Sequence, residues 1–491
     1  MNYALVWKLL SIILAALMVC FMGSFGIAFY YDHGMEGAAA ELGFFWSALI
    51  AGGGSLGFYL AGRNGSAVMH TKEALTVIGL GWICASLFGA LPYYFILPNI
   101  TIAGAIFESA SGLTTTGASV LSQLETLPRS LHFWRSISQW IGGLGVVVFF
   151  VAVLSFLGAG AKVLYSRESS GQAAELDTGR VQQGILRLIY LYLGLSFACA
   201  LIFYLLGLNI FEAVTHMFTT ISTGGFSTRS DSVGAFQNPA LEWAFVLFMM
   251  LGGTSFIPMV RACRGDWSGI RKSTEIRWFY GIAFGATVLM GFFLLIDPNF
   301  SFDFHEILRA SAFQVVSILT TSGFATEDYN HWLPGAHVLL ILLMAIGGCS
   351  GSTSGGAKVI RVVIALRICV MNIERAFRTR VVRTLRVNGE PVDSSTQENV
   401  LVFLVMLMVL TFLSGLALAL LQPNVSLEGL LSAMFACLFN IGPGFAEVGP
   451  VENFAHFHEP ALILLSLLMI LGRVELFAVL ALFAPSLWRK F

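Results

Sequence analysis

Residues 105–117 read AIFESASGLTTTG, and three later stretches repeat this pattern without a gap. They are AVTHMFTTISTGG at 213–225, SAFQVVSILTTSG at 311–323 and SAMFACLFNIGPG at 432–444. Each stretch begins as a short apolar segment, continues into a Gly-containing polar run, and lies between two longer apolar runs. One cluster of Gly and Thr predicts only a turn, but four clusters in the same setting predict an internal repeat.

The ends of the four stretches have the chemistry of a cation filter. Backbone carbonyl oxygens can replace the water shell of K+ without adding fixed charge. Gly permits positive φ, Ser and Thr hydroxyls supply more oxygens, and a helix ending at the loop directs its negative dipole end toward a cation. The predicted potassium-binding residues are Thr114, Thr115, Thr116, Gly117, Ser222, Thr223, Gly224, Gly225, Thr320, Thr321, Ser322, Gly323, Ile441, Gly442, Pro443 and Gly444.

The composition places these loops in a membrane. Of the 491 residues, 57% are hydrophobic and only 11% are charged, whereas a soluble domain is about 25% charged. This balance excludes a disordered chain, and a net charge of -1 without a basic domain argues against a nucleic-acid-binding protein. The seven cysteines have no paired spacing and indicate neither a disulfide framework nor a metal site. We therefore predict an all-α polytopic membrane protein.

Apolar runs of sufficient length predict ten membrane spans. The predicted spans are 5–31, 41–62, 74–97, 134–160, 184–207, 240–262, 277–297, 335–371, 398–421 and 458–484. Four shorter runs, at 104–113, 210–221, 306–319 and 428–439, predict either amphipathic caps or segments that enter the membrane without crossing it and are buried in protein or line water. Lys and Arg gather in alternate loops, which predicts that both termini are cytoplasmic and that the four short runs lie on the outer side.

The repeat also predicts how the chain is divided. Each unit consists of a span, a pore loop and a second span, and it occurs four times after an extra helix pair; the family resemblance described below implies a pseudo-fourfold arrangement of these units. The predicted parts are an N-terminal transmembrane helix pair (1–72), pore repeat 1 (73–162), pore repeat 2 (163–263), pore repeat 3 with a broken second helix (264–371), a basic cytoplasmic linker (372–397) and pore repeat 4 (398–491).

The eighth span is interrupted by IGGCSGSTSGGAKV at 346–359. Each Gly in a helix costs about 1 kcal/mol relative to Ala, so a break is predicted here. Two interpretations stay open: a kinked helix packed through small residues, or an irregular loop that lines the cavity below the filter and acts as a gate. The gate interpretation assigns Gly347, Gly348, Gly351, Gly355, Gly356, Lys358 and Arg473.

Arg473 is a charged residue inside the tenth predicted span. A charge at a helix centre costs roughly 2.5–3.5 kcal/mol on insertion scales and normally faces protein or water. Arg473 is therefore either a structural salt bridge to a neighbouring helix or a positive barrier to cations below the filter. Glu475 beside it and Glu108 in the first short segment are the intramembrane carboxylates that would support proton coupling.

The linker at 372–397 contains five Arg within 375–386. It either anchors the chain on anionic lipid or docks a cytoplasmic partner. No HExxH or paired Asp motif occurs in the sequence, so an intramembrane enzyme with these chemistries is not expected.

The four loops TTTGAS, STGGFST, TTSGFAT and NIGPGF, with the extra N-terminal pair, resemble the superfamily of K+ transporters that includes the Trk, Ktr and plant HKT proteins. They are most similar to its TrkH-type membrane subunits. The resemblance implies one filter glycine per repeat, here Gly117, Gly225, Gly323 and Gly444. Na+-favouring members often carry Ser at the first position, so Gly117 argues for K+. A gating loop at 346–359 and a pore-facing Arg473 are also implied.

The resemblance further implies K+ uptake across a bacterial cytoplasmic (inner) membrane. K+ would be the transported ion, with no organic cofactor in this chain and no nucleic acid among its partners. Its expected partners are the lipid bilayer, a second copy in a homodimer, and a cytosolic nucleotide-binding regulatory subunit resembling TrkA. A K+ symporter coupled to H+ or Na+ stays open as the alternative.

Overall fold

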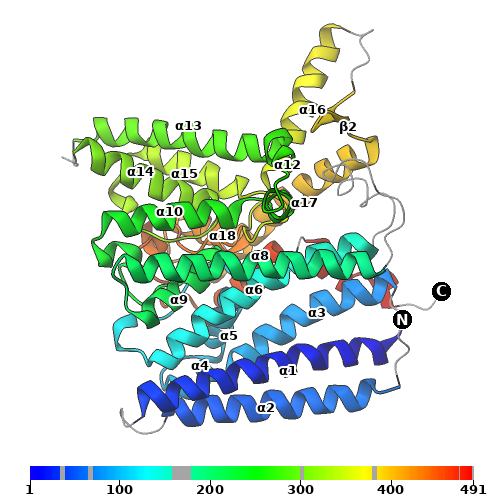
Figure 1. Ribbon diagram of the computed structural model, residues 1–491, viewed down its shortest axis with the longest axis vertical. Helices are drawn as coiled ribbons and strands as arrows, with labels where there is room; N and C mark the ends of the chain where they lie inside the picture. The colour runs from blue at the N-terminus through cyan, green and yellow to red at the C-terminus, as the bar shows by residue number, and fades with distance from the viewer. Residues whose placement is uncertain are drawn as a thin grey trace.

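The structure, a computed structural model, describes residues 1–33, 39–64, 70–156, 178–298, 303–378, 384–474 and 476–488. Within these ranges the protein is helical, apart from one antiparallel hairpin formed by β1 (Arg386–Val387) and β2 (Glu390–Pro391). Long helices run side by side through the body, as Figure 1 shows. The predicted all-α polytopic class is confirmed.

The long helices fall into three groups. The N-terminal pair at one edge of the molecule (Figure 1) comprises α1 (Tyr3–Ile27) and α2 (Ala39–Gly62). The first helices of the four helix–loop–helix units are α3 (Thr71–Gly89), α8 (Thr178–Leu205), α13 (Thr274–Ile296) and α17 (Ser394–Leu421). The second helices are α6 (Arg129–Phe156), α10 (Pro239–Gly253) with α11 (Phe256–Ala262), α15 (Pro334–Ile346) with α16 (Val359–Phe377), and α19 (Glu459–Arg473) with α20 (Phe477–Leu482).

Smaller elements connect these helices. They are α4 (Leu91–Ile96), α12 (Ser268–Lys272), α21 (Pro485–Trp488), a π-helical turn (Ala28–Asp32), and 3-10 turns at Leu124–Thr126, Ser232–Phe236, Tyr329–His331 and Ala446–Val448. The π-helical turn joins the N-terminal pair to the first unit, because the Asp32 carboxylate accepts the backbone N–H groups of Arg129 (3.0 Å) and Ser130 (2.9 Å) at the start of α6. A carboxylate at a helix N-terminus is favourable.

A short helix lies inside each unit, as the four short apolar runs predict. These helices are α5 (Ile102–Leu113), α9 (Ile210–Ile221), α14 (Phe304–Leu319) and α18 (Leu427–Leu438). Each begins after a residue whose side-chain oxygen accepts a backbone N–H of the first turn, a strong helix start signal. The capping residues are Thr101, Asn209, Asp303 and Ser426.

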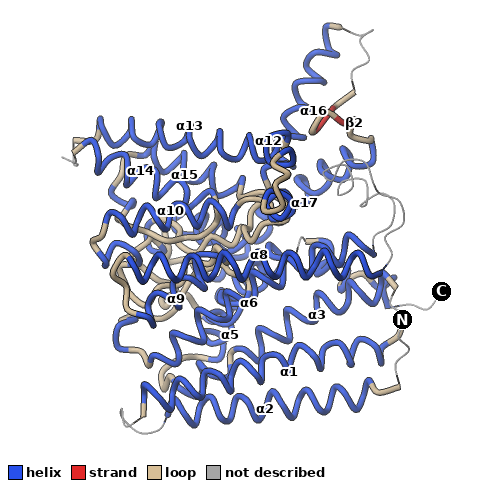
Figure 2. Tube along the Cα trace, viewed as in Figure 1, coloured by secondary structure: helices blue, strands red, loops and turns tan. Residues whose placement is uncertain are grey.

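The units are interlocked in a cyclic order. The second helix of each unit packs against the short helix of the next unit: α6 against α9, α10 against α14, and α15 against α18. The last second helix, α19, packs against α5 of the first unit and closes the cycle. Each short helix is therefore held between its own unit and the preceding one, and loop segments run through the interior of the body instead of staying at its ends (Figure 2).

Several predicted spans are interrupted. Among the described residues, six helical stretches are long and apolar enough to cross a membrane in one piece, and α10 with α11 forms a further pair bent by 102°. The prediction of a continuous helix over 240–262 is therefore wrong at Thr254, and that over 458–484 is wrong at Val474. The predicted break in the eighth span is confirmed, because α15 ends at Ile346 and α16 starts at Val359.

The bend between α10 and α11 has a backbone cause. The carbonyl of Gly253 accepts the N–H of Cys349 (2.9 Å), and the N–H of Phe256 donates to the carbonyl of Gly351 (3.1 Å). Segment 347–358 thus takes hydrogen bonds that a continuous helix would make within itself. A buried backbone group needs a partner in either case, so the bend and the segment stabilise each other.

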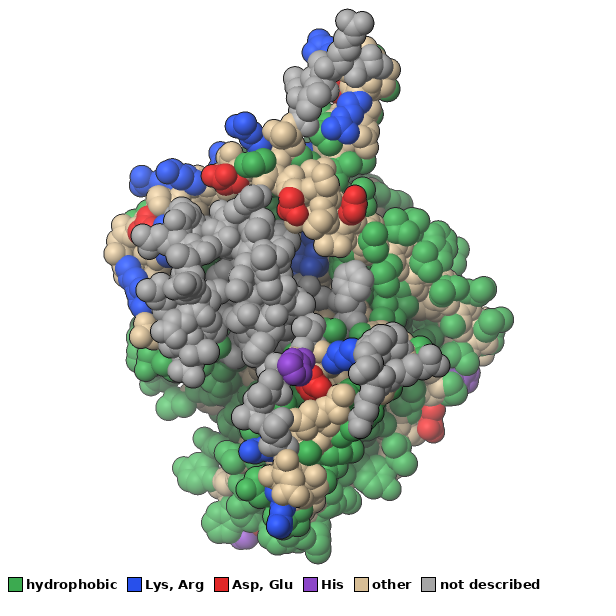
Figure 3. Space-filling view, turned by 90° about the vertical axis from the view of Figure 1, so that its right-hand side faces the viewer, with side chains coloured by type: hydrophobic (Ala, Val, Ile, Leu, Met, Phe, Trp, Pro, Cys, Tyr) green, Lys and Arg blue, Asp and Glu red, His purple; other side chains and the backbone are tan. Residues whose placement is uncertain are grey.

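The N-terminus and the β1–β2 hairpin lie toward the same side of the molecule (Figure 1). Lys and Arg side chains gather on this face, as Figure 3 shows. Residues 157–177 and 379–383 of the predicted basic loops, together with Glu475, Arg489 and Lys490, lie outside the described residues.

Candidate ion pathway

The loop after each short helix has one repeated backbone conformation. The residue after the helix cap has φ between 53° and 56°, and the glycine two residues later has φ between 75° and 106°. These pairs are Thr115 and Gly117, Thr223 and Gly225, Thr321 and Gly323, and Asn440 and Gly442. The residue between them donates its N–H to the carbonyl five residues back, a helix-ending bond of the Schellman type. The donors are Thr116, Gly224, Ser322 and Ile441.

This geometry corrects the predicted register of the fourth loop by two residues. The counterpart of Gly117 is Gly442, not Gly444, because α18 ends at Leu438. Gly444 has no positive φ, and its carbonyl accepts the hydroxyl of Tyr329 (3.0 Å). The aligned string contains two glycines, and a gapless alignment selected the second. Pro443 and Gly444 therefore follow the loop, and the loop itself is 439–442.

The four glycines form a closed ring of contacts. A methyl group placed on Gly117 would lie 2.2 Å from the carbonyl oxygen of Gly224 in the second loop. A methyl group placed on each of the other glycines would also meet a carbonyl oxygen of the next loop. The distances are 2.0 Å from Gly225 to Ser322, 2.0 Å from Gly323 to Ile441 and 2.7 Å from Gly442 to Thr116, each measured from the placed methyl carbon to the carbonyl oxygen. Each glycine thus contacts a carbonyl of the next loop. Positive φ and lack of space both require Gly at these positions.

The ring is polar without fixed charge. The Thr114 and Thr116 hydroxyls lie 2.7 Å apart, and the Thr320 and Ser322 hydroxyls lie 2.9 Å apart. In the fourth loop the amide of Asn440 donates to the Thr116 hydroxyl (2.9 Å). The C-terminal ends of all four short helices meet at this ring, so their partial negative charge is directed toward it.

A hollow of about 250 Å³ lies against the ring. All four ring glycines line the hollow, and so do the charged residues Arg229 and Glu452. Ser230, which also lines the hollow, donates its N–H and its hydroxyl to the Glu125 carboxylate, both at 2.7 Å. Burial raises the pKa of Glu125, but these hydrogen bonds outweigh it and hold the pKa below its ordinary value.

Segment 347–358 lies directly against the helix ends that form the ring. The Thr353 hydroxyl lies 3.0 Å from the carbonyl oxygen of Ile221, the last residue of α9. The N–H of Gly355 donates to the Thr321 hydroxyl (2.7 Å), and that of Gly356 donates to the Phe439 carbonyl (3.1 Å). The segment therefore contacts the second, third and fourth units at once, and its residues 349 and 351–355 are buried.

The predicted gate glycines have the backbone geometry of an irregular loop. Gly347, Gly351 and Gly356 have positive φ of 76°, 70° and 77°, and so does Lys358 at 76°. A non-Gly residue in this region is strained by roughly 1–3 kcal/mol. The Lys358 ammonium donates to the carbonyl of Ser354, which holds the end of the loop.

Arg473 of α19 also contacts segment 347–358. It is the last residue of α19, is only 5% exposed, and donates to the carbonyl of Thr353 (2.7 Å). Its other guanidinium nitrogens, Nε and Nη2, have no hydrogen-bond partner in the described part of the chain. No carboxylate pairs with Arg473 among the residues that the structure describes. The guanidinium therefore brings a buried positive charge to the middle of segment 347–358.

Two contacts of these loops could not be found from the sequence. The carboxylate of Glu275, in the first turn of α13, accepts the N–H of Ser350 (2.6 Å) and holds the start of the segment. Gln139 of α6 contacts the second loop. Both residues lie far along the chain from the loops they touch, and neither belongs to a recognisable motif.

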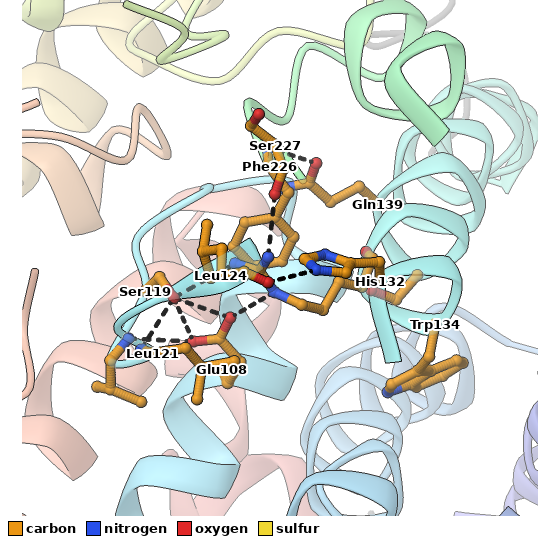
Figure 4. Close-up of polar contacts among 12 residues, drawn as sticks. Glu108, Ser119, Leu121, Leu124, His132, Trp134, Gln139, Phe226 and Ser227 are labelled. Carbon is orange, nitrogen blue, oxygen red and sulfur yellow. Dashed lines mark hydrogen bonds and ion pairs between the residues drawn. The ribbon is translucent and has the colours of Figure 1, made fainter. Parts of the chain in front are cut away.

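Glu108, the carboxylate predicted inside the first short helix, is engaged by partners within the protein. It is fully buried and pairs with Arg135 at 2.9 Å, and it also accepts the Ser119 hydroxyl and the N–H of Val120 (Figure 4). Removing one partner of such a pair would leave a buried charge uncompensated. Its contacts give Glu108 a structural role behind the first loop.

A body of apolar helices in which four short helices converge on a ring of carbonyl oxygens defines a membrane cation-transport protein. The chain belongs to the TrkH family, described as cation transport proteins, which it matches over residues 40–490.

Relatives agree with this assignment over most of their length. The chain is 33% identical over 435 residues to the Trk system potassium uptake protein TrkH of Escherichia coli (strain K12), covering 87% of this chain and 88% of that protein. It is 32% identical over 415 residues to the Trk system potassium uptake protein TrkI of Halomonas elongata, covering 84% and 83%. The crystal structure of the potassium transporter TrkH from Vibrio parahaemolyticus is similar with a TM-score of 0.90 and 29% identity, covering 100% of both chains.

Proposed function

We propose that this chain is the membrane subunit of a K+ uptake system and that K+ passes through the ring of four loops. The observation that carries the proposal is the closed ring, in which each of four glycines contacts a carbonyl of the next loop. The relatives named above are K+ uptake proteins, which supports the same ion here.

The chemistry of the ring suits an ion that must exchange water for oxygen ligands. The carbonyls that precede the glycines belong to Thr116, Gly224, Ser322 and Ile441, and four helix ends add negative potential. The ring loops contain no carboxylate, and Glu108 is engaged by Arg135. These contacts do not favour the H+-coupled alternative, so we propose flux down the electrochemical gradient.

Segment 347–358 is the proposed gate of this pathway. It occupies the helix ends beneath the ring, and Arg473 adds a positive charge there. Opening requires the segment to leave Ile221, Thr321 and Phe439. A regulatory partner that moves α16 would act on the segment directly, since α16 begins where the segment ends.

The basic face is the proposed cytoplasmic side. It carries the N-terminus and the hairpin (Figures 1 and 3), and cytoplasmic loops are rich in Lys and Arg. We propose that the chain lies in a bacterial inner membrane as a homodimer, with a cytosolic nucleotide-binding subunit docked near α16 and residues 384–397.

Ion flux into proteoliposomes tests the proposal. We expect the wild-type chain to carry K+ in strong preference to Na+, and Gly323→Ala to lose this preference, because its methyl group would meet the Ile441 oxygen. Gly285→Ala on α13 is the matched control, since nothing lies within 4 Å of a methyl group there. Equal K+ and Na+ flux in the wild type, or an unaffected preference in Gly323→Ala, would contradict the proposal.

A further inference from the structure

Gln139 of α6 contacts the second loop on both sides of its ring glycine. Its Nε2 donates to the carbonyl of Gly224 (2.6 Å), and its Oε1 accepts the N–H of Phe226 (3.2 Å). Gly225 lies between these two bonds. Figure 4 shows the Gln139 amide beside Phe226. Both polar ends of this fully buried side chain are therefore used on one short stretch of the ring.

Gly224 differs from its counterparts in the other loops. The corresponding residues are Thr116, Ser322 and Ile441, all of which have side chains. A methyl group placed on Gly224 would lie 2.4 Å from Cδ and Oε1 of Gln139. The amide of Gln139 thus occupies the space that a side chain fills in the other three loops.

The second helices differ from one another at the position that corresponds to Gln139. Each second helix has a glycine near its middle or at its end, at Gly142, Gly252, Gly347 and Gly472. The residue three positions before this glycine is Gln139 in α6, but it is Met249, Met344 and Met469 in the other units. All four side chains are fully buried. In the cyclic order, each helix with Met packs beside a loop whose residue before the ring glycine has a side chain. The helix with Gln139 packs beside the loop in which that residue is Gly224.

Arg135, one turn before Gln139 on α6, makes a second contact with the second loop. It lies four residues before Gln139, on the same helix face, donates to the carbonyl of Ser227 (3.2 Å), and lies 4.2 Å over the Phe226 ring. The Glu108 carboxylate fixes the Arg135 guanidinium in turn. Residues 224–227 are thus held at two points by one rigid helix, in addition to their own helix end.

We propose that Gln139 is a positioning residue that sets the ion preference of the second loop. Its amide stands in for the missing side chain at Gly224 and fixes the direction of the Gly224 carbonyl, which contacts Gly117 in the ring. This carbonyl already accepts one hydrogen bond and is therefore a weaker ion ligand than its three counterparts. The proposal rests on the proposed function of the ring.

Three variants test whether the Gln139 amide replaces a side chain at Gly224. The measurement is the K+ to Na+ permeability ratio, obtained from reversal potentials in proteoliposomes. Gln139→Met removes both hydrogen bonds, and we expect the ratio to fall by roughly tenfold, which corresponds to about 1.4 kcal/mol. Gly224→Ser pushes a side chain against the amide and is expected to lower the ratio as well. The double variant reproduces the Met249 and Ser322 pairing, and we expect it to recover most of the ratio.

The same preparations distinguish the possible failures. Gly225→Ala tests the ring itself: if it leaves the ratio unchanged, the proposed function fails first. If Gly225→Ala lowers the ratio but Gln139→Met does not, the positioning role is wrong. A loss in Gln139→Met that the double variant does not recover also overturns the proposal, because the amide would not be replacing a side chain. Where Gln139→Met does not fold, Gly224→Ala displaces the amide from the other side and is expected to lower the ratio too.

Discussion

The ring and segment 347–358 are both loops rich in small residues at the centre of the helical body, yet they are held in different ways. The ring has four copies of one backbone conformation, each fixed by its own helix end and by contact with the next loop. Segment 347–358 occurs once and is held by separate bonds to parts of three units, such as Gly355 to Thr321. This difference agrees with the proposed roles of the two loops, because a filter keeps its shape and a gate moves.

Energetics supports this division. A typical hydrogen bond contributes about 1 kcal/mol net, so the three bonds that join the segment to Ile221, Thr321 and Phe439 can be broken at a cost of a few kcal/mol. Distorting the ring would strain four loops together. If the ring is the filter and segment 347–358 is the gate, as proposed, selectivity and gating should change independently in the variants below.

The largest effect is expected for a change in the ring itself. Gly117→Ser places a side chain at φ 87°, which costs roughly 1–3 kcal/mol, and its Cβ would lie 2.2 Å from the Gly224 oxygen. We expect the K+ to Na+ permeability ratio to fall by about tenfold or more, measured as reversal potentials in mixed salts. An unchanged ratio in a well-folded variant would remove the first loop from the filter.

The corrected register of the fourth loop gives a paired test. Gly442→Ala should lower the permeability ratio, because its methyl group would lie 2.7 Å from the Thr116 oxygen at φ 106°. Gly444→Ala should lower thermal stability through crowding against Ser432 and Val448 but leave the ratio intact. The opposite result, with selectivity lost only in Gly444→Ala, would restore the register predicted from the sequence.

Deletion within the segment should act on flux and leave selectivity unchanged. Removing residues from Gly351–Gly356 takes away the contacts to Ile221 and Thr321, so we expect basal K+ flux to rise several-fold without a regulatory partner. The measurement is K+ efflux from liposomes, with the permeability ratio as an internal control. Wild-type flux from a stable deletion variant would rule out the gate.

A smaller increase is expected for Arg473→Ala. A positive charge about 4 Å from a passing cation opposes it by roughly 4 kcal/mol at an effective dielectric of about 20, before hydration reduces this value. We expect several-fold higher flux, while Arg473→Lys, which keeps the charge, should stay near the wild type. A lower melting temperature with unaltered flux per folded molecule would show that Arg473 has only a structural role.

The sequence predicts most of this architecture, because much of it follows from local composition. The short helices carry their own start signals, such as Thr101 and Asn209, and the density of Gly after Ile346 predicts the broken helix. Three of the four ring glycines could be assigned from the repeated strings alone. In the fourth loop the string offers Gly442 and Gly444, and only the position at which α18 ends decides between them.

The remaining features depend on contacts between distant parts of the chain. The bend after Gly253 follows from its bond to Cys349, although the apolar run alone predicts a continuous helix. Gln139 and Glu275 each contact a loop that lies 75 or more residues away in the sequence. Periodicity and composition carry no information about such pairs, so these residues could be found only in the folded structure.

The central claim, that four loops form one ion site, is tested most directly by locating a bound ion. Crystals of the protein grown in Rb+, a heavier analogue of K+, would be used to collect anomalous diffraction data. We predict an anomalous peak on the axis of the ring, between the carbonyl oxygens of Thr116, Gly224, Ser322 and Ile441, and its loss when Na+ replaces Rb+. A ring without a peak in a crystal of a conducting preparation, or a peak only outside the four loops, would contradict the account.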